Sequence, residues 1–418
     1  MNSILNFEEA SELIKEHFKF LKPTITEVVL LDSVGYLLAE DIISDIYMPS
    51  FDNSQMDGYA VKYNEDIREW DVIGEIAAGN FKDIEIRGYL ALSIMTGAML
   101  PTGADTVIPL ENVNIESNRI KLKDGFVLRK GNEIRYKGED LKHGEIAVHK
   151  GTPIKSNHIP LIATCGKRMV KVKAPLNIGF FATGDELINI DTLPQKDQVR
   201  SSNLITLTAL INELKMLPVN FGIVSDDKIL LKEAVENAIK SDINILITTG
   251  GVSVGKYDYL KEVIEECGFE TVFWKVKVKP GKPLLFSIYK KSGRNILYFG
   301  LPGNPVSAFT SFCLFIKPFI SELYKYEPQT RFKAILEHDL IKKDNRKTFV
   351  RGFADFNNSA LNTQHPTLNN SSCTVRKAGG GTQSSGDMSS LSNANCLILF
   401  DENESKLNAG DIVECIMI

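Results

Sequence analysis

Residues 244–255 read NILITTGGVSVG, an apolar run that ends in a glycine-rich turn. A short apolar run bounded by glycines is typical of a buried strand. The residues that follow, from Tyr257 to Cys267, carry apolar side chains at helical spacing and predict a helix. This stretch therefore predicts a strand, a loop and a helix in that order, which is the repeating unit of an α/β sheet.

The same unit recurs on both sides of this stretch, over residues 174–327. Strands and helices that alternate at this length predict a mostly parallel, doubly wound sheet with helices on both faces. Asn304-Pro305 predicts the start of the last helix, because asparagine is a good N-cap residue and proline suits the first helical position. The predicted strands are 177–183, 219–224, 244–249, 272–278 and 295–300, and the predicted helices are 202–214, 228–240, 257–267 and one that starts at Pro305.

The flanking sequences indicate three further domains. Residues 44–144 contain short β-type runs broken by Gly, Asn and Asp, which predict a β-rich domain. Residues 1–43, with a helix at 7–20, and residues 145–173 are expected to form one small α+β linking domain. Residues 328–418 return to short strands, with a closing strand pair near 406–418. The expected fold class is therefore multidomain α/β: a doubly wound three-layer α/β domain, a β-rich domain, a small α+β region and a C-terminal β-barrel-like domain.

The composition excludes several classes of function. The 418 residues carry a formal net charge of −5, which argues against bulk binding to nucleic acid or to an anionic membrane. The six cysteines and six histidines are dispersed, so they are read as reduced thiols and ordinary side chains rather than a zinc site. The amino terminus is acidic where a signal peptide is basic, and no apolar run approaches about 18 residues. A cytoplasmic protein is expected.

Three loops of the α/β block have the features of an anion-binding site. The predicted strands end in Gly184-Asp185-Glu186, in Gly250 to Gly255 and in Leu301 to Pro305. Ligands of open α/β sheets bind beyond the carboxyl ends of the strands, where backbone amides and helix amino ends meet an anion. The spacing matches neither the dinucleotide fingerprint nor a P-loop. The alternative is that these glycines only make tight turns.

A row of lysines follows the second of these loops. In Trp274-Lys275-Val276-Lys277-Val278-Lys279 the residues alternate, so a single strand places the valines on one face and all three lysines on the other. Pro280-Gly281-Lys282-Pro283 then turns the chain and adds a fourth ammonium group. These lysines are interpreted as a clamp for an oxyanion and a phosphate. The alternative is an edge strand that uses lysine to prevent aggregation.

Five carboxylates in turn-like contexts are candidate metal or catalytic groups: Asp57, Asp140, Glu186, Asp226 and Asp258. Phosphate-bearing ligands usually bring Mg²⁺, which prefers carboxylate and water oxygens. The alternative reading makes each a turn or capping residue. Asp258 and Asp226 each precede a predicted helix, where a carboxylate satisfies free backbone N–H groups.

Seven segments, in order, resemble one known family. They are FDNSQMDGYAV, IMTGAMLPTGADTVIPLE, GNEIRYKGEDL, ATGDEL, TTGGVSVGKYDY, KVKPGKP and FGLPGNPVSA, and QSSGDMSSLSNANCLIL adds a match near the carboxyl end. Together they resemble the molybdopterin molybdenumtransferases, that is, the bacterial MoeA family and the corresponding domain of gephyrin. The resemblance covers nearly the whole chain. It departs from the family at Arg200-Ser201-Ser202-Asn203, where an acidic or other polar residue often precedes the asparagine, although Asn203 remains available to cap the helix.

The resemblance implies a transferase of molybdenum cofactor biosynthesis. Adenylated molybdopterin would bind with its phosphate-bearing part on the glycine loop, molybdate would replace copper or protons at the dithiolene, and AMP would leave in an Mg²⁺-dependent step. The catalytic residues that it implies are Asp57, Thr96, Asp140, Glu186, Asp226, Asp258, Lys275 and Lys279, of which Glu186, Asp226 and Asp258 would hold metal. The cofactor-binding residues are Thr249, Gly250, Gly251, Val252, Ser253, Gly255, Lys282, Pro302, Gly303 and Asn304.

The resemblance also implies that the doubly wound domain bears the cofactor site and that residues 1–43 and 145–173 form a dimerisation domain. The implied homodimer is elongated, and the β-rich domain of one subunit faces the α/β domain of the other. A molybdopterin-adenylating enzyme and downstream cofactor-maturation proteins are possible partners. Two alternative functions stay open at this point. One is a scaffold that binds a peptide, as gephyrin does with receptor loops, and the other is transfer of AMP to molybdopterin.

Overall fold

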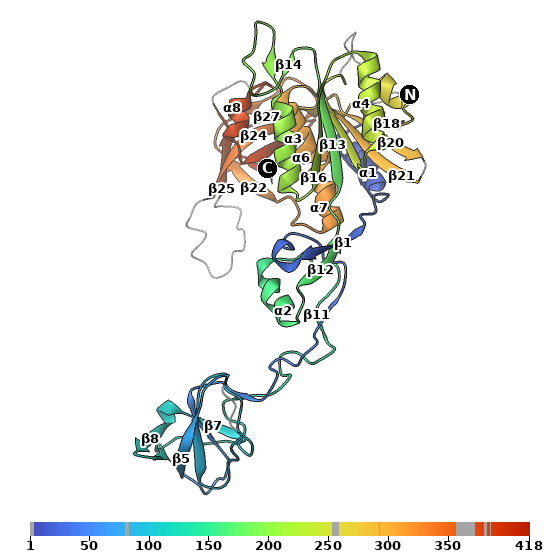
Figure 1. Cartoon of the computed structure of the whole chain (residues 1–418). Helices are drawn as coiled ribbons and strands as arrows, with labels where there is room; N and C mark the ends of the chain where they lie inside the picture. Colours follow the sequence, from blue (N-terminus) through green and yellow to red (C-terminus); the bar gives the residue numbers. More distant parts are fainter. Residues whose placement is uncertain are drawn as a thin grey trace. The chain divides into compact units, whose positions relative to one another are not determined.

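The computed structural model describes residues 4–79, 83–252, 259–291, 293–356, 373–379, 383–384 and 386–418. The chain folds into two compact units (Figure 1). Unit 1 comprises Met1–Thr26, Gly35–Leu37 and Lys173–Ile418. Unit 2 comprises Glu27–Val34 and Leu38–Val172.

The centre of unit 1 is a six-stranded sheet in the order β16-β13-β17-β21-β20-β18. The first four strands in this order are parallel, and the last two run antiparallel to their neighbours. The predicted mostly parallel sheet is confirmed. The strands are β13 (Asn177–Thr183), β16 (Leu217–Val224), β17 (Ile245–Thr249), β18 (Glu270–Trp274), β20 (Leu285–Lys291) and β21 (Arg294–Leu301), and a short parallel pair, β14 (Leu187–Ile188) with β15 (Val199–Arg200), follows β13.

Helices cover both faces of this sheet, as predicted. The helices α4 (Lys228–Lys240) and α5 (Leu260–Glu266) bury one apolar core with the sheet. The helices α3 (Ser202–Glu213), α6 (Pro305–Phe315) and α7 (Lys317–Tyr324) bury the other. The carboxyl ends of the parallel strands therefore lie at one edge of a three-layer block.

The amino-terminal helix α1 (Phe7–Phe18) packs into the same core. Asn6 and Glu9 form a capping box that fixes its start, and its buried face includes Phe7, Ile14 and Phe18. The Phe18 ring lies 5.4 Å from the Phe319 ring. Although the sequence reading grouped residues 1–43 with residues 145–173, this helix is part of unit 1.

One helical stretch of the described residues, Pro305–Tyr324, is long and apolar enough to cross a membrane by length and composition. The sequence reading did not anticipate it. The stretch comprises α6 and α7, which join at Ile316, and 67% of its most apolar window is buried inside unit 1. This burial is typical of a core helix pair.

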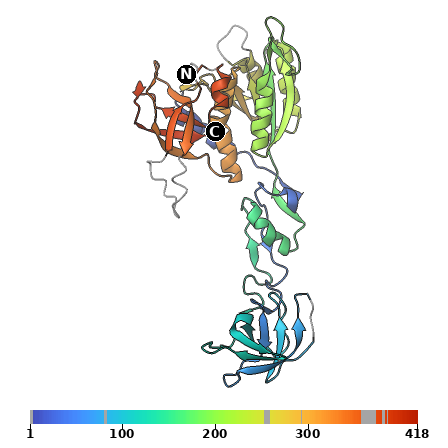
Figure 2. The same cartoon turned by 90° about the vertical axis from the view of Figure 1, so that its left-hand side faces the viewer.

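Five strands near the carboxyl end close into a barrel, which Figure 2 shows in orange and red beside the α/β block. They are β22 (Arg331–Leu336), β24 (Lys347–Phe356), β25 (Cys373–Lys377), β26 (Cys396–Phe400) and β28 (Ile412–Met417), with β24 pairing both β25 and β26. The predicted barrel-like domain is confirmed. The predicted closing strand pair is wrong, because β27 (Lys406–Leu407) pairs with β23 (Leu340–Ile341) and β28 pairs with β22 and β26. A short helix, α8 (Met388–Ser392), precedes β26.

The barrel is joined to the α/β block by a sixth strand. This strand, β19 (Val278–Lys279), belongs to the lysine row and pairs in parallel with the start of β24. The Phe7 ring of α1 lies 5.4 Å from Phe315 of α6 and 5.2 Å from Phe349 of β24. The two parts of unit 1 therefore share backbone pairing and a common aromatic contact.

Unit 2 is β-rich, as the sequence predicted. Its main sheet has the order β7-β4-β6-β5-β9-β8. Gly58 of β4 is required there, because a Cβ atom would stand 2.1 Å from the carbonyl oxygen of Ile108. The elements of this part of the chain are β1 (Ile25–Val29), η1 (Leu30–Asp32), β2 (Ile42–Ile43), β3 (Asn53–Ser54), β4 (Gly58–Val61), β5 (Glu69–Ile76), β6 (Leu90–Ile94), β7 (Thr106–Pro109), η2 (Leu110–Asn112), β8 (Val113–Glu116), β9 (Arg119–Leu122), β10 (Ile134–Arg135), β11 (Ile146–Val148), η3 (Ser156–His158), α2 (Ile159–Thr164) and β12 (Met169–Lys173).

Candidate functional site

Three loops meet at the carboxyl edge of the sheet in unit 1. The Gly250 N–H donates to the carbonyl of Leu301 at 3.1 Å. A Cβ atom on Gly250 would stand 2.3 Å from the Thr183 carbonyl oxygen, and one on Gly303 would stand 3.5 Å from Gly250 Cα. The loops that follow β13, β17 and β21 are therefore in van der Waals contact, and only a residue without a side chain fits at position 250. The predicted binding residues Gly250, Gly251, Val252, Pro302, Gly303 and Asn304 lie in these loops, and Thr249 is the last residue of β17. The predicted residues Ser253, Gly255 and Asp258 lie outside the described residues.

Asn203 joins this meeting point from the start of α3. Its side-chain amide donates to the carbonyl of Gly303 at 2.8 Å. The expectation that Asn203 caps the helix is wrong, because Ser201 occupies the N-cap position. Within the described part of the chain, the buried Asn203 Oδ1 and Thr249 Oγ1 atoms have no hydrogen-bond partner. This edge of the sheet thus contains polar atoms whose hydrogen-bonding capacity the described residues leave unused.

The carboxylates at this edge differ in their hydrogen-bond partners and in their structural roles. Asp226 accepts a hydrogen bond from the Thr183 hydroxyl. The alternative that Asp226 caps α4 is wrong, because the cap is Asp227, whose Oδ1 accepts from Ile229 N–H at 2.9 Å and Leu230 N–H at 3.0 Å. Glu186 is exposed, and its carboxylate lies beside Gly184, with Oε2 2.7 Å from the position of a Cβ atom there.

Sequence reasoning missed Asp185, which orders the turn between these groups. Its Oδ1 accepts from the Ser225 hydroxyl and from the Asp226 N–H, the latter at 3.1 Å. These hydrogen bonds, the Ser225 hydroxyl first, lower the pKa of Asp185. Asp185 therefore links the β13 loop to the β16 loop and holds the backbone of Asp226.

Glu186 and Asp226 fit Mg²⁺ in the chemistry of their oxygen donors. Magnesium is usually held by one or two carboxylates together with water and substrate phosphate oxygens. No group of three His, Cys, Asp or Glu side chains that could hold a metal occurs in the part of the chain that the structure describes. Any metal bound by these two carboxylates would therefore complete its shell with other oxygens.

Trp274 connects the glycine loop to the lysine row, a contact that sequence reasoning missed. Its indole N–H donates to the carbonyl of Val252 at 3.0 Å. The Lys275 ammonium lies 4.0 Å from the centre of the Trp274 ring, a cation–π contact. The backbone of Lys275 has a φ of 81°, a positive value that is uncommon for residues other than glycine. The Trp274 side chain therefore fixes both the loop carbonyl and the first lysine.

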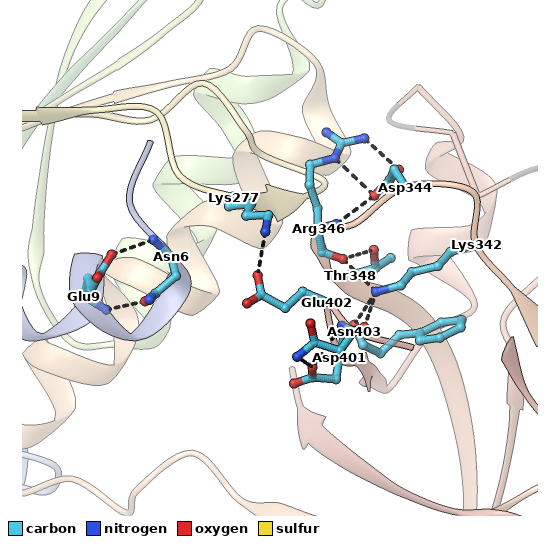
Figure 3. Close-up of polar contacts among 11 residues, drawn as sticks. Asn6, Glu9, Lys277, Lys342, Asp344, Arg346, Thr348, Asp401, Glu402 and Asn403 are labelled. Carbon is cyan, nitrogen blue, oxygen red and sulfur yellow. Dashed lines mark hydrogen bonds and ion pairs between the residues drawn. The ribbon is translucent and has the colours of Figure 1, made fainter. Parts of the chain in front are cut away.

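The lysine row does not form the single strand that the alternation predicted. The valines are buried as expected, but β18 ends at Trp274 and β19 starts only at Val278, because the left-handed backbone of Lys275 interrupts the strand. Lys277 pairs with Glu402 at 3.3 Å and Lys279 with Asp344 at 3.1 Å (Figure 3 shows the first of these pairs). The lysines thus have different partners rather than one common face.

The turn after the row packs against α6. Gly281 has a φ of 99°, and a Cβ atom there would stand 2.5 Å from the Ser311 hydroxyl. The carbonyl of Lys282 accepts from the Val276 N–H at 3.0 Å, while the Lys282 side chain is exposed. The turn is therefore rigid at its glycine and presents Lys282 to solvent.

A basic pocket of about 410 Å³ lies where this turn meets the barrel. Arg351 is 1% exposed and donates to the Ser390 hydroxyl at 2.7 Å and to the Ser384 carbonyl at 3.0 Å. Burial lowers its pKa. Among the residues that the structure describes, five cationic ones line the pocket, namely Lys279, Lys342, Lys343, Arg351 and Lys377. The acidic Asp339 also lines it and pairs with Lys406 at 2.7 Å. Such an arrangement suits a small anion.

The remaining predicted residues lie in unit 2. Both the backbone N–H and the hydroxyl of Thr96 donate to Asp57 Oδ1, each at 2.7 Å, and these bonds lower the pKa of Asp57. Asp140 forms an ion pair with Arg135 of β10. The strand β10 pairs with β3, and Asn53 of β3 also forms a bridge with Met99. Three separate sequence motifs, around Asp57, Thr96 and Asp140, are thereby brought together.

Comparison with known proteins gives one consistent result along the chain. Residues 5–166 match the MoeA N-terminal region (domain I and II), residues 179–322 match a probable molybdopterin binding domain, and residues 333–418 match the MoeA C-terminal region (domain IV). The three matches follow one another in the order of a single protein architecture.

Individual relatives agree over nearly the full length. A molybdopterin molybdenumtransferase from Haemophilus influenzae is 34% identical over 419 residues, which covers 98% of each chain. One from Staphylococcus aureus is 32% identical and covers 94% of this chain and 91% of the relative. The crystal structure of a molybdopterin biosynthesis MoeA protein from Pyrococcus horikosii superposes with a TM-score of 0.79 at 27% identity and covers 99% of each chain.

Proposed function

Because the chain belongs to the MoeA family of molybdopterin molybdenumtransferases, we propose that it inserts molybdate into adenylated molybdopterin and releases AMP. The observation that carries this proposal is that unit 1 contains both a basic pocket lined by Lys279 and a junction of the three loops that follow β13, β17 and β21. One site suits a small oxyanion, and the other suits a phosphate-bearing ligand.

The adenylated substrate would bind at the edge where the loops after β13, β17 and β21 meet. Glycine at position 250 allows the closest approach of backbone to ligand, and α6 begins directly after Asn304. The amino end of a helix favours an anion, because its first N–H groups have no partner within the helix. Lys275, fixed over Trp274, and the exposed Lys282 would add positive charge from the neighbouring turn.

Molybdate would occupy the basic pocket. It is a tetrahedral dianion, and the pocket is lined by Lys279 of β19 and by Arg351 of the neighbouring strand β24. Arg351 is already held by Ser390 and Ser384, so little side-chain entropy is lost when an anion binds. The pocket thus combines a fixed guanidinium with a more exposed ammonium.

Release of AMP is hydrolysis of the phosphoanhydride that joins AMP to the substrate phosphate. Water attacks phosphorus, the bond to the bridging oxygen breaks, and the proton passes to a carboxylate. Glu186 and Asp226 stand at the loop edge where this bond would lie, and Asp226 is oriented by the Thr183 hydroxyl. These two residues, together with Asp258, would also hold the Mg²⁺ of the reaction, which would offset phosphate charge.

The proposal includes a cytoplasmic homodimer. Asp57, Thr96 and Asp140 are grouped in unit 2, whereas the glycine loops and the lysine row belong to unit 1. A second copy of the chain would supply one group to the other. The molybdopterin-adenylating enzyme would deliver the substrate, and the cofactor-maturation proteins would receive the product.

The direct test is release of AMP from adenylated molybdopterin in the presence of Mg²⁺, with and without molybdate. We expect release that depends on molybdate and on Mg²⁺, and a product that activates a molybdenum-free acceptor enzyme. Absence of molybdate-dependent release would contradict the proposal. Transfer of AMP from ATP to molybdopterin by this chain would instead favour the adenylating function.

A further inference from the structure

Asp344 holds the ammonium group of Lys279, the lysine of β19 that lines the basic pocket. The distance from Lys279 Nζ to Asp344 Oδ2 is 3.1 Å. The Lys279 side chain is 45% exposed and that of Asp344 is 28% exposed. Among the described residues, Lys279 lines the pocket and Asp344 does not. The carboxylate therefore binds the same ammonium that a pocket ligand would use.

Arg346 fixes the Asp344 carboxylate on both oxygens. Its Nε donates to Oδ1 at 3.2 Å, its Nη2 donates to Oδ2 at 2.9 Å, and its backbone N–H donates to Oδ1 at 3.2 Å. These bonds, with that to Lys279, lower the pKa of Asp344. Asp344 is therefore a charged and immobilised group rather than a loose surface carboxylate.

Lys342 anchors the loop that carries Asp344 and Arg346 (Figure 3). Its buried ammonium donates to the carbonyl of Arg346 at 2.9 Å, to that of Phe400 at 3.4 Å and to that of Asp401. The loop before β24 is thus fixed to the end of β26, the strand that pairs with the start of β24. Because the Lys342 ammonium already donates to these carbonyls, Lys279 is more available than Lys342 to bind an anion in the pocket.

We propose that Asp344 is a positioning residue that acts through Lys279: it competes with a bound oxyanion for this ammonium and so weakens the binding of that oxyanion. An oxyanion in the pocket shares Lys279 with a fixed negative charge and is repelled by that charge. A tetrahedral dianion that is to be passed on must also leave the pocket, and the Asp344 charge favours its departure. This inference rests on the proposed function in taking the pocket as the molybdate site.

The neighbouring pair Lys277–Glu402 provides a matched control. It also joins the lysine row to the barrel, at 3.3 Å, with side chains of similar exposure. Neither residue is among the described residues that line the pocket. Glu402→Gln removes the same charge from the same interface, so it separates the effect on Lys279 from a general change in the electrostatic field.

The experiment is calorimetric titration of sodium molybdate into the full-length chain at low ionic strength. We expect Asp344→Asn to bind molybdate about fivefold more tightly, since a partly exposed ion pair is worth up to about that factor. Glu402→Gln should change the affinity much less. Lys279→Met should weaken binding, and Asp344→Asn should have no further effect in the Lys279→Met background. The KM for molybdate should fall in Asp344→Asn in step with the affinity.

A tighter affinity cannot arise from partial unfolding, so the expected result distinguishes a positioning role from a merely structural one. Unchanged or weaker binding by Asp344→Asn, with Lys279→Met weakened, would overturn the inference and leave the proposed function intact. Equal tightening in the Lys279→Met background would also overturn it. If Lys279→Met bound molybdate as tightly as the unmodified chain, the pocket assignment and the inference would both fall, while molybdate-dependent AMP release would still test the function separately.

Discussion

Asp57 and Thr96 are joined by two hydrogen bonds to a single oxygen, Asp57 Oδ1, one from the backbone and one from the hydroxyl of Thr96, each at 2.7 Å. The two residues lie 39 positions apart and come from different motifs. The bonds keep the pKa of Asp57 below its ordinary value. The second carboxylate oxygen receives neither of these two bonds.

Asp57→Asn should lower molybdenum insertion about a hundredfold, the scale of a lost acid–base or charge-stabilising group. Thr96→Val should lower it less, because the backbone N–H remains in place. In Thr96→Val the pKa of Asp57 should rise toward about 3.9, the ordinary value. Carboxyl NMR titration measures the pKa, and AMP release measures the activity. Full activity of Asp57→Asn would remove this residue from the site.

The Asp57–Thr96 pair also predicts a dependence of stability on pH. Because the folded-state pKa of Asp57 is lowered, the pair stabilises unit 2 above the unfolded pKa of about 3.9. This contribution is lost as pH falls through the folded-state pKa. Urea unfolding of the unmodified chain and of Asp57→Asn should therefore differ most above pH 4 and converge at lower pH. An equal difference at all pH values would contradict the assignment.

Asp226 and Asp227 are adjacent in sequence but should respond oppositely to substitution. Asp227→Ala removes the cap of α4 and should lower the free energy of unfolding by about 1 kcal/mol without lowering kcat. Asp226→Asn should lower AMP release about a hundredfold with little change in stability. Urea unfolding measures the stability of both variants, and steady-state kinetics measures their kcat. Each variant serves as the control for the other. A loss of kcat confined to Asp227→Ala would reverse the two roles.

Gly250 and Gly303 provide a matched pair at the loop junction. Gly250→Ala places a Cβ atom 2.3 Å from the Thr183 carbonyl at a φ of 98°, so it should destabilise unit 1 by about 2 kcal/mol or more. Gly303→Ala meets only ordinary contact at 3.5 Å and should cost much less. Chemical denaturation of both variants tests this difference. Equal stability of the two would show that the loops are free to separate.

Trp274 should report ligand binding through its fluorescence. Trp274→Phe keeps a ring beneath Lys275 but removes the hydrogen bond to Val252, so the KM for the adenylated substrate should rise about fivefold, equivalent to about 1 kcal/mol. Trp70, the other tryptophan, belongs to unit 2. A fluorescence change on substrate binding should therefore disappear in Trp274→Phe. Its persistence would place the signal at Trp70.

Individual strands and helices were predicted correctly where their own residues show an apolar run or a helical repeat. The strand Asn177–Thr183 and the helix Lys228–Lys240 have the predicted bounds, because an apolar run and a helical repeat are visible without knowledge of partners. The strand predicted through Lys275 failed because a single residue with positive φ overrides alternation. Nothing in the residue types of Lys275 and its neighbours signals that conformation.

The candidate site was predictable only where its residues lie in motifs. The glycine loops after β13, β17 and β21 were predicted to form an anion site, since ligands of open α/β sheets bind beyond the carboxyl ends of the strands. The basic pocket was not predicted, because Lys279 and Arg351 are 72 positions apart and no periodicity relates them. The choice between Asp226 and Asp227 as the helix cap likewise depends on backbone geometry rather than on residue type.

The pairing of β19 with β24 has a consequence for how unit 1 folds. The strand β19, which belongs to the lysine row, forms backbone hydrogen bonds with β24 of the barrel. Unfolding of either the α/β block or the barrel would therefore break this pairing. Unit 1 should therefore lose its structure in one cooperative transition, despite matching two family regions. A fragment that ends before the barrel would expose an unpaired strand edge and leave Lys277 and Lys279 without counter-ions. The two regions match separate family models, yet we expect them to unfold as a single cooperative unit.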